Sequence, residues 1–544
     1  MTTPTALPEP DPVAAPPLAR DGVLNRVGRW SARLAEHSNP ILVRVVRQEL
    51  RSRAFISVFV LLLTGGTIAA LITAVIAAND SQSQSSNLAR GFFGTIAAGW
   101  AFALGVVQPM GCFRAIATER NEDTWDLVEL TGLRPVRVVL GLLLASLVQG
   151  LLYTSALAPF MVMAYLLRGI DMLEVLFVLV VIPLGGIAVA ALAVFMACLG
   201  GNKATRGFLS AVLGLGLLFA WMGSCGLWFN LREVGSVLDE LRSGDAAVWA
   251  GLAAWLNAWA AHLVVMLVFS SALLAFRAAN RSTGPRLAWC GLWLNGLIWA
   301  IIIPWMLPGY ASLDERLSWA LTGYAIGGMA HAGLLGLFAV SEDYELSPRQ
   351  ARSISQARGW RRPFMLLFGP GAARGRLAWL ALAGLTLIVA GLGWMLSGFE
   401  MPPDIGRSNR FSMAVVCWTM CCWLGILFVV GDLLYRGWLA SWFPTPPLRR
   451  GFVLLLGALW MLLPPIALKL AGFEIEDNAL SWFSPWSAVW MASEFDSDMW
   501  RPFLLFSLLG AAALLVLLVQ GLRHLKLVTH RIVARDDDHN PRGG

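Results

Sequence analysis

Residues 174–199 read EVLFVLVVIPLGGIAVAALAVFMACL, and their only charged side chain is the first one. A helix needs about 20 mostly apolar residues to cross the hydrocarbon core of a bilayer. Inside lipid the backbone finds no water, and a helix satisfies its own N–H and C=O groups. This stretch therefore predicts a membrane-spanning helix.

The rest of the chain repeats this pattern. Of 544 residues, 57% are hydrophobic and 14% charged, whereas an average soluble domain has about 25% charged residues. Twelve apolar runs reach spanning length: 54–78, 91–111, 138–165, 174–199, 208–229, 250–276, 289–308, 317–341, 377–397, 412–434, 451–471 and 502–522. None shows the polar–apolar alternation of a barrel strand. The sequence thus predicts an all-α, polytopic helical membrane protein with about 12 transmembrane helices.

Basic residues indicate the orientation of these helices. If the N-terminus is cytoplasmic, most of the 41 lysine and arginine residues fall in inside segments, including seven arginines in 342–376. Such an excess is typical of cytoplasmic loops, so both termini are predicted to be cytoplasmic. The net charge of +7 is then a topology signal. No basic soluble face suggests nucleic acid as a partner.

The runs also suggest a division of the chain. Residues 1–38 are rich in proline and alanine and are expected to form a disordered cytoplasmic tail. A first six-span unit covers 39–276 and a second covers 277–522. Residues 523–544 form a second cytoplasmic tail.

Residues 39–53 (NPILVRVVRQELRSR) have two different helical faces. Five aliphatic side chains fall within one half-circle of a helical wheel, and Arg44, Arg47 and Arg51 lie on the other. This pattern predicts an interfacial amphipathic helix on the inner leaflet, with its arginines near anionic headgroups. The alternative is a cytoplasmic extension of the first span.

Residues 114–137 (RAIATERNEDTWDLVELTGLRPVR) join the second and third spans and mix acids with apolar side chains. A short helix is expected from about 121 to 131, with acids in its first turn and Gly132 as a stop. Its apolar residues either enter the inner leaflet or dock on a partner protein. Docking is the favoured interpretation, because a simple turn needs neither five acids nor an exposed Trp125.

This region resembles the permease subunits of ABC transporters of the type-2 exporter family. A span ends in Gln108 and Pro109, and the strings ATER (117–120), TWDL (124–127), TGL (131–133) and RVVLG (137–141) follow. The helix at 39–53 is also similar to the family's N-terminal amphipathic helix. The resemblance covers roughly residues 39–276.

The resemblance implies a mechanism driven by a partner. A separate cytosolic ABC ATPase subunit binds ATP and magnesium, and its movement reaches the spans through a coupling helix in the 114–137 loop. The coupling residues implied are Glu119, Arg120, Glu122, Thr124, Trp125 and Asp126. No GxxxxGK[ST] motif for phosphate binding occurs in the chain. We therefore expect no cofactor and no catalytic residue here, and localisation in a bacterial cytoplasmic (inner) membrane.

The second half is open to two interpretations. It is either a diverged second permease unit, which makes the chain a covalent pseudo-dimer, or an unrelated extension of a chain that works as a monomer or homodimer. Glu342 and Asp343, followed by LSPR (346–349), are only a faint echo of the coupling pattern. The substrate, and the residues that bind it, are unknown from the sequence.

Ionisable residues within spans are functional candidates by default. Asp432 and Lys469 lie near span ends, where a structural role is expected. His262 and His331 lie deeper and are expected to be neutral and hydrogen-bonded between helices, with proton relay as the alternative. Cys417, Cys421 and Cys422 are expected to be buried thiols, and no metal site is expected.

Three other functions stay open. An ion-coupled secondary transporter calls for paired acids and broken helices in matching repeats, but few acids occur in mid-span. A membrane-embedded enzyme calls for a convergent catalytic set, and only six histidines are present. A non-transporting membrane scaffold is compatible with every feature above.

Overall fold

The described residues of this computed structural model are 40–79, 85–121, 133–167, 170–200, 202–229, 238–275, 280–306, 312–343, 345–355, 359, 361–398, 410–443, 446–471, 484 and 500–539. They form helices joined by turns, and no strand occurs among them. The chain is therefore all-α, as predicted. The expected N-terminal tail, 1–38, lies outside this part of the chain.

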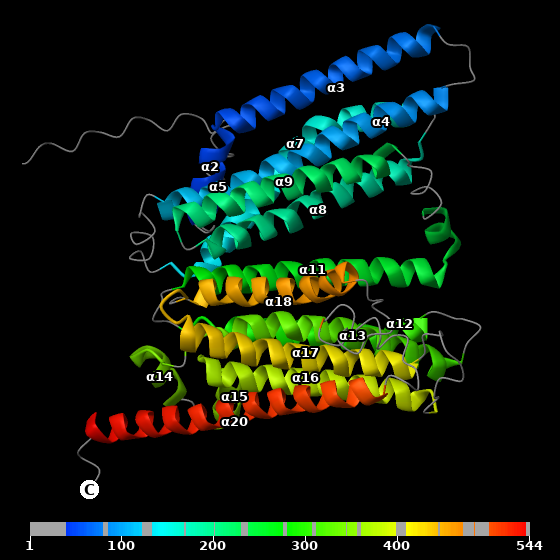
Figure 1. Cartoon of the computed structure of the whole chain (residues 1–544). Helices are drawn as coiled ribbons and strands as arrows, with labels where there is room; N and C mark the ends of the chain where they lie inside the picture. Colours follow the sequence, from blue (N-terminus) through cyan, green and yellow to red (C-terminus); the bar gives the residue numbers. More distant parts are fainter. Residues whose placement is uncertain are drawn as a thin grey trace, which may run out of the picture.

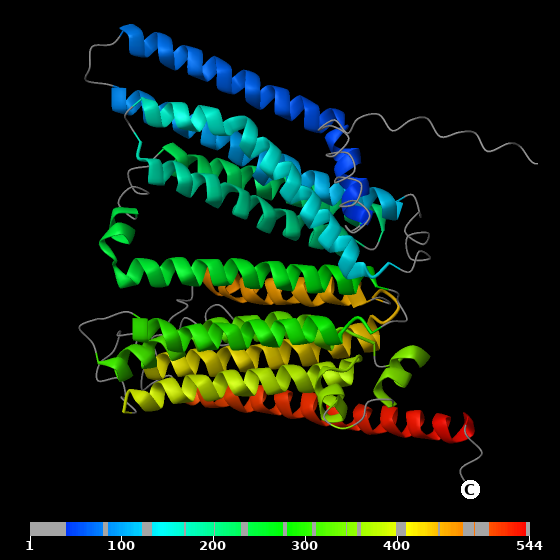
Figure 2. The same ribbon diagram turned by 180° about the vertical axis from the view of Figure 1, so that it is seen from behind.

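The long helices run roughly parallel to one another, with α3 at one side of the molecule and α20 at the other (Figures 1 and 2). Their order across the molecule is not that of the chain, since α18 lies next to α11 in both views. The helices up to residue 274 form a first set. They are α2 (Pro40–Leu50), α3 (Arg53–Asn79), α4 (Ser85–Phe102), the π-helical turn η1 (Ala103–Val107), α5 (Gln108–Asn121), α7 (Pro135–Leu166), α8 (Met172–Leu199), α9 (Lys203–Phe229) and α11 (Ala246–Leu274).

The remaining helices form a second set. They are α12 (Thr283–Met306), α13 (Leu313–Val340), α14 (Pro348–Ser355), α15 (Arg361–Phe368), α16 (Ala372–Leu396), α17 (Arg410–Leu433), η2 (Leu434–Trp438), α18 (Pro446–Leu470) and α20 (Trp500–His539). α14 and α15 are short and lie in the segment that the sequence shows as a long basic loop. α20 continues beyond its apolar part into the predicted C-terminal tail.

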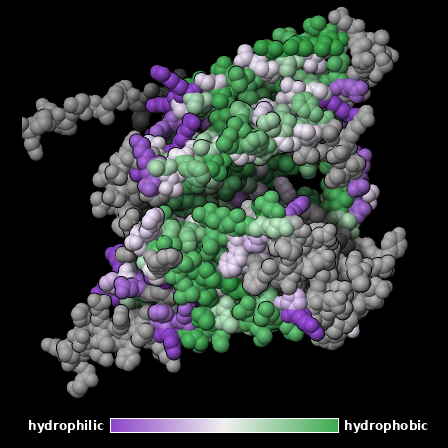
Figure 3. All heavy atoms as spheres, viewed as in Figure 1, coloured by the Kyte–Doolittle hydropathy of each residue, from purple (hydrophilic) through white to green (hydrophobic). Residues whose placement is uncertain are grey.

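Eleven of these helical segments are long and apolar enough to cross a membrane. Each corresponds to a predicted run. The twelfth run, 451–471, forms most of the 25-residue helix α18, which is not one of the eleven. Hydrophilic side chains gather at the two ends of the helices and hydrophobic ones in between (Figure 3). Such a band is typical of a multi-pass membrane protein. The orientation of the chain stays a prediction.

Each set has its own buried cores. Two clusters draw their buried residues from positions up to Leu274, and two others draw theirs from Trp293 onward. Phe269 of α11 joins the sets, because its ring contacts Phe195 of α8 on one side and Trp289 and Phe338 on the other. The junction is thus an aromatic cluster centred on α11.

The second set repeats most of the packing order of the first. In the first set α5 packs on α8, α7 on α8 and α11, α9 on α4 and α8, and α11 on α8. The spans at the same places in the second set pack likewise: α13 on α17, α16 on α17 and α20, α18 on α13 and α17, and α20 on α17. The pair of α3 and α7 has no counterpart among the closely packed helix pairs of the described residues.

Close helix packing in the second set depends on Gly336 of α13. A Cβ atom there would lie 2.3 Å from Cε2 of Phe428 and 2.7 Å from Cδ1 of Trp379. The rings of Phe428 and Trp379 contact each other edge to face, with centroids 5.1 Å apart. Small residues allow such close approach where lipid provides no hydrophobic drive for helices to associate.

We therefore predict that Gly336→Ala lowers the stability of the protein by about 1–3 kcal/mol, the usual cost of overpacking a core. The measurement is the apparent melting temperature in detergent, followed by size-exclusion chromatography of heated samples. Gly327→Ala is the matched control on the same helix, because a Cβ atom at Gly327 meets nothing within 4 Å. Equal melting temperatures for the two variants would contradict this account of the packing.

Candidate functional site

The base of the predicted docking loop lies at the end of α5. This helix continues to Asn121, so residues 114–121, expected in the loop, extend the second span. Glu119 and Arg120 lie in the last turn of α5. The other predicted coupling residues, Glu122, Thr124, Trp125 and Asp126, lie outside the described residues. The expected helix at 121–131 falls almost wholly in the same gap.

Two arginines fasten this end of α5 to the turn between α8 and α9. Arg120 donates from Nη1 to the carbonyl oxygen of Cys198 at 2.8 Å. Arg206 of α9 donates to the carbonyl oxygens of Arg120 and Gly200, at 3.2 Å each. The last carbonyl groups of a helix have no partner within it, and basic side chains commonly satisfy them. Arg206 is 6% exposed, so it acts as a buried clamp between α5, α8 and α9.

The N-terminal helix α2 is joined to the same place. Arg44 donates to a carboxylate oxygen of Glu119 at 2.8 Å. The apolar face of α2 is not free for lipid along its whole length, because Ile41 and Val45 pack on the core formed by α5, α7, α8, α9 and α11. The interfacial interpretation is therefore incomplete: protein covers part of this face. Arg47, in α2, and Arg51, in the following turn, are exposed.

Glu49 is the acidic residue of α2, and it is only partly exposed. Burial raises the pKa of its carboxyl group above the ordinary value, because loss of water disfavours the charged form.

The contacts of Arg44, Arg120 and Arg206 connect four helices, α2, α5, α8 and α9, at the base of the 122–132 segment. A force applied to that segment would reach all four.

A second group of polar residues lies at the matching end of the second set. The sequence places Arg374 and Arg376 in a cytoplasmic loop, but this expectation is wrong. α16 begins at Ala372, and the two arginines are 2% and 0% exposed. Gly371 allows this early start, since its φ of +102° is a conformation that glycine adopts at little cost.

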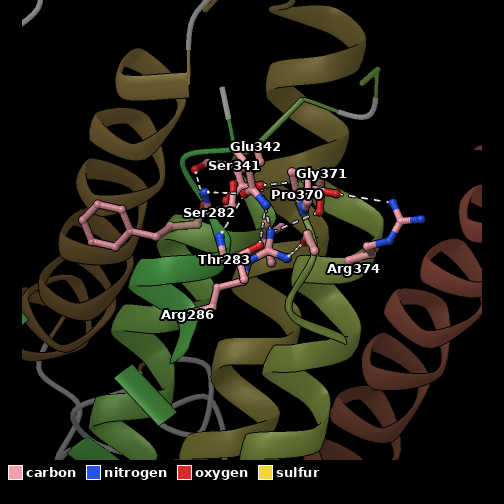
Figure 4. A network of polar contacts seen from close by, with 12 residues as sticks. Ser282, Thr283, Arg286, Ser341, Glu342, Pro370, Gly371 and Arg374 are labelled. Atoms are coloured by element: carbon pink, nitrogen blue, oxygen red, sulfur yellow. Dashed lines mark hydrogen bonds and ion pairs between the residues drawn. The ribbon is translucent and has the colours of Figure 1, made fainter. Parts of the chain in front are cut away.

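Arg286 of α12 lies at the centre of this network (Figure 4). Its Nη1 donates to the carbonyl oxygen of Gly369. Its Nη2 donates to the carboxylate of Glu342 at 2.8 Å and to the carbonyl oxygen of Gly371 at 3.1 Å. The Glu342 carboxylate also accepts the backbone N–H of Gly371 at 3.0 Å. Arg286 and Glu342 together hold the start of α12 and the end of α13 against the start of α16.

Asp432 forms the deepest ion pairs of the described residues. One oxygen lies 2.5 Å from Nη2 of Arg376, and the other lies 2.5 Å from Nε of Arg436. The hydroxyl of Tyr435 donates to the same carboxylate at 3.0 Å. Arg376 also donates to the side chain of Gln520 on α20. These contacts are typical of a structural residue, which is the role expected of Asp432.

The other candidates from the sequence occupy ordinary positions. His262 hydrogen-bonds the carbonyl oxygen of Ala188, and His331 that of Trp289, both at 3.1 Å. His331 also stacks on the ring of Trp289, with centroids 4.4 Å apart. Lys469 is exposed. The three cysteines at 417, 421 and 422 are buried free thiols, and no group of three metal-ligating side chains occurs in the searched, described residues.

Comparison with protein-family models, curated proteins and solved structures finds no match. The geometry of the site includes Arg206 and Arg286, which no sequence motif marks. Their signal in the sequence is an arginine just before an apolar run, which a topology rule counts simply as a positive charge.

We predict that Asp432→Asn lowers stability by about 3 kcal/mol or more, because it removes the carboxylate that pairs with the fully buried Arg376 and the partly buried Arg436. The measurement is the yield of folded protein and its apparent melting temperature. Asp343→Asn serves as the control, since the carboxylate of Asp343, paired with Arg449 at 2.5 Å, is 55% exposed and such pairs contribute little. A loss as large in the control as in Asp432→Asn would refute this assignment.

Proposed function

We propose that the chain is the permease subunit of an ATP-driven ABC exporter in a bacterial cytoplasmic membrane. A separate cytosolic ATPase subunit would dock on the 114–137 loop and hydrolyse ATP, and this chain would supply the path through the membrane. The observation that carries the proposal is the fastening of the loop base, where Arg44, Arg120 and Arg206 join α2, α8 and α9 to the end of α5.

This fastening provides the means to transmit movement. A docked partner can act on the spans only if the docking segment is coupled to a packed element with two arrangements. Arg206 is buried and donates to carbonyl groups at the ends of α5 and α8, so displacement of one end strains the other. The sequence motif at 117–127 begins within this fastened turn, which supports its interpretation as a coupling element.

The arrangement of the two helix sets also supports a transport role. The second set repeats much of the packing order of the first, which favours the covalent pseudo-dimer over an unrelated extension. The face drawn in Figure 3 is hollowed where α8 and α11 lie in Figure 1, beside the helix that carries the junction residue Phe269. Alternating access would then consist of rigid movement of one set against the other about the aromatic junction at Phe269. The transported substrate is not part of this proposal.

Ion-coupled transport finds less support in the geometry. It requires an intramembrane carboxylate that can exchange a proton or cation. Asp432 is the buried carboxylate among the described residues, and two guanidinium groups and a hydroxyl occupy it. An acid held in this way serves poorly as an ion carrier.

We predict that an ATPase with a phosphate-binding loop copurifies with the native chain, and that Trp125→Ala combined with Asp126→Ala abolishes the association. The pair removes the aromatic side chain and one acid of the predicted docking segment. The measurement is purification from the native host in mild detergent after cross-linking in cells, with mass spectrometry and ATP hydrolysis as readouts.

The control is Trp319→Ala combined with Asp314→Ala. Both residues lie in the first turns of α13, at the opposite end of the helices, so this variant should retain the ATPase. The absence of any ATPase from the native sample would refute the proposal and favour the ion-coupled transporter or the scaffold. Equal loss in both double variants would refute the location of the coupling segment.

A further inference from the structure

Arg374, at the start of α16, is a buried cation, and few groups of the described residues offset its positive charge. It is 2% exposed. Its one hydrogen bond within the described residues runs from Nη1 to the carbonyl oxygen of Pro370 at 3.4 Å. Its Nε is buried and has no hydrogen-bond partner there. No carboxylate of the described residues forms an ion pair with it.

The other nearly fully buried arginines of the second set each pair with a carboxylate, although Nε of Arg286, like that of Arg374, makes no hydrogen bond to the described residues. Arg286 has the carboxylate of Glu342 and two carbonyl oxygens. Arg376 has Asp432 and Gln520. Figure 4 shows the difference directly: Arg286 points into the network of dashed contacts, and Arg374 extends away from it to the other side of the Gly369–Gly371 turn.

The unoccupied edge of the Arg374 side chain has a defined chemistry. Nε and Nη2 lie on the same edge of a guanidinium group and donate two parallel N–H bonds. This fork matches two oxygens of a carboxylate or phosphate, and such bidentate pairs are among the strongest hydrogen bonds in proteins. Nη1, which contacts Pro370, is on the opposite side. Arg374 therefore retains its anion-binding edge.

The surroundings add positive charge. The contacts at this end of the second set involve six arginines, Arg286, Arg374, Arg376, Arg436, Arg449 and Arg450, and three carboxylates, Glu342, Asp343 and Asp432. An isolated buried charge is costly, and an excess of one sign in one place increases that cost. An anion bound beside Arg374 would lower it.

We propose that Arg374 binds a phosphate group at this end of α16. Arg374 lies in the first turn of a membrane span, which is the depth of lipid headgroups, on the face that the arginine distribution predicts to be cytoplasmic. Basic sites between spans on that side typically hold the headgroups of anionic lipids. The phosphate is thus that of an inner-leaflet lipid or a free phosphate ion. The proposal does not depend on the ATP-driven exporter.

The test measures the apparent melting temperature of the delipidated full chain with two probes. One probe is inorganic phosphate added in detergent, with chloride at equal ionic strength as reference. The other is reconstitution into nanodiscs of phosphatidylglycerol, with phosphatidylcholine as reference. A ligand that binds the folded state raises the melting temperature, and we expect a rise of about 2–5 °C with one probe.

Variants assign this rise to the site. Arg374→Gln removes the charge and should abolish the rise, and without anions it should be at least as stable as the native chain. Arg376→Gln is the control: it loses the pair with Asp432 and should be less stable, but it should retain the rise. A rise with phosphatidylglycerol alone identifies a lipid ligand, and a rise with inorganic phosphate alone identifies a free ion. No rise, or one that persists in Arg374→Gln, overturns the proposal.

A measurement on the native chain covers the case in which Arg374→Gln does not fold. The native chain and Arg374→Lys, which retains the charge but loses the fork, are purified side by side, and bound phospholipid is counted by native mass spectrometry. At least tenfold less bound anionic lipid in Arg374→Lys supports a lipid at this site. If equal lipid remains on both and inorganic phosphate shifts neither melting temperature, Arg374 is simply a buried structural arginine and the proposal is wrong.

Discussion

The carboxylate of Asp432 holds together the elements that meet at one end of the second helix set. It binds Arg376 of α16 and Arg436 of η2. Arg436 in turn donates to the carbonyl oxygens of Val340, the last residue of α13, and of Glu342 beyond it. Arg376 also donates to the side chain of Gln520, which connects this network to α20. Helices in lipid gain little from hydrophobic attraction to one another. A charge network at the headgroup level can therefore decide which helix ends meet.

The first set solves the same problem with carbonyl groups in place of a carboxylate. Arg206 and Arg120 are paired with the backbone oxygens of helix ends, at Gly200, Arg120 and Cys198. Neutral acceptors hold a guanidinium less firmly than a carboxylate does. Apart from the more exposed pair of Arg44 and Glu119, the end of α5 is thus fastened by weaker bonds than those that Asp432 forms in the second set.

The sequence predicts the membrane fold well because an apolar run of spanning length has one favourable structure in lipid. Residues 174–199 show this, as they coincide almost completely with α8. Prediction from the sequence fails at helix ends, because the length of an apolar run does not show where the helix begins or ends. Arg376 looks like a loop cation until Asp432 and Gln520, far along the chain, are brought beside it. Of the predicted coupling residues, Glu119 and Arg120 lie in the last turn of α5 and not in the loop where they were expected. Their partners Arg44, Cys198 and Arg206 come from helix packing that no local pattern encodes.

The two helix sets therefore share more than their packing order. In the first, an arginine at the start of the fifth span, Arg206, donates to the end of the second span. In the second, an arginine at the start of α18, Arg450, donates to Ser341 at the end of α13, which is the equivalent place. Arg450 also lies over the ring of Phe338, 4.6 Å from its centroid, and Phe338 contacts the junction residue Phe269. A displacement at the end of α13 can thus reach α11, and through α11 the first set.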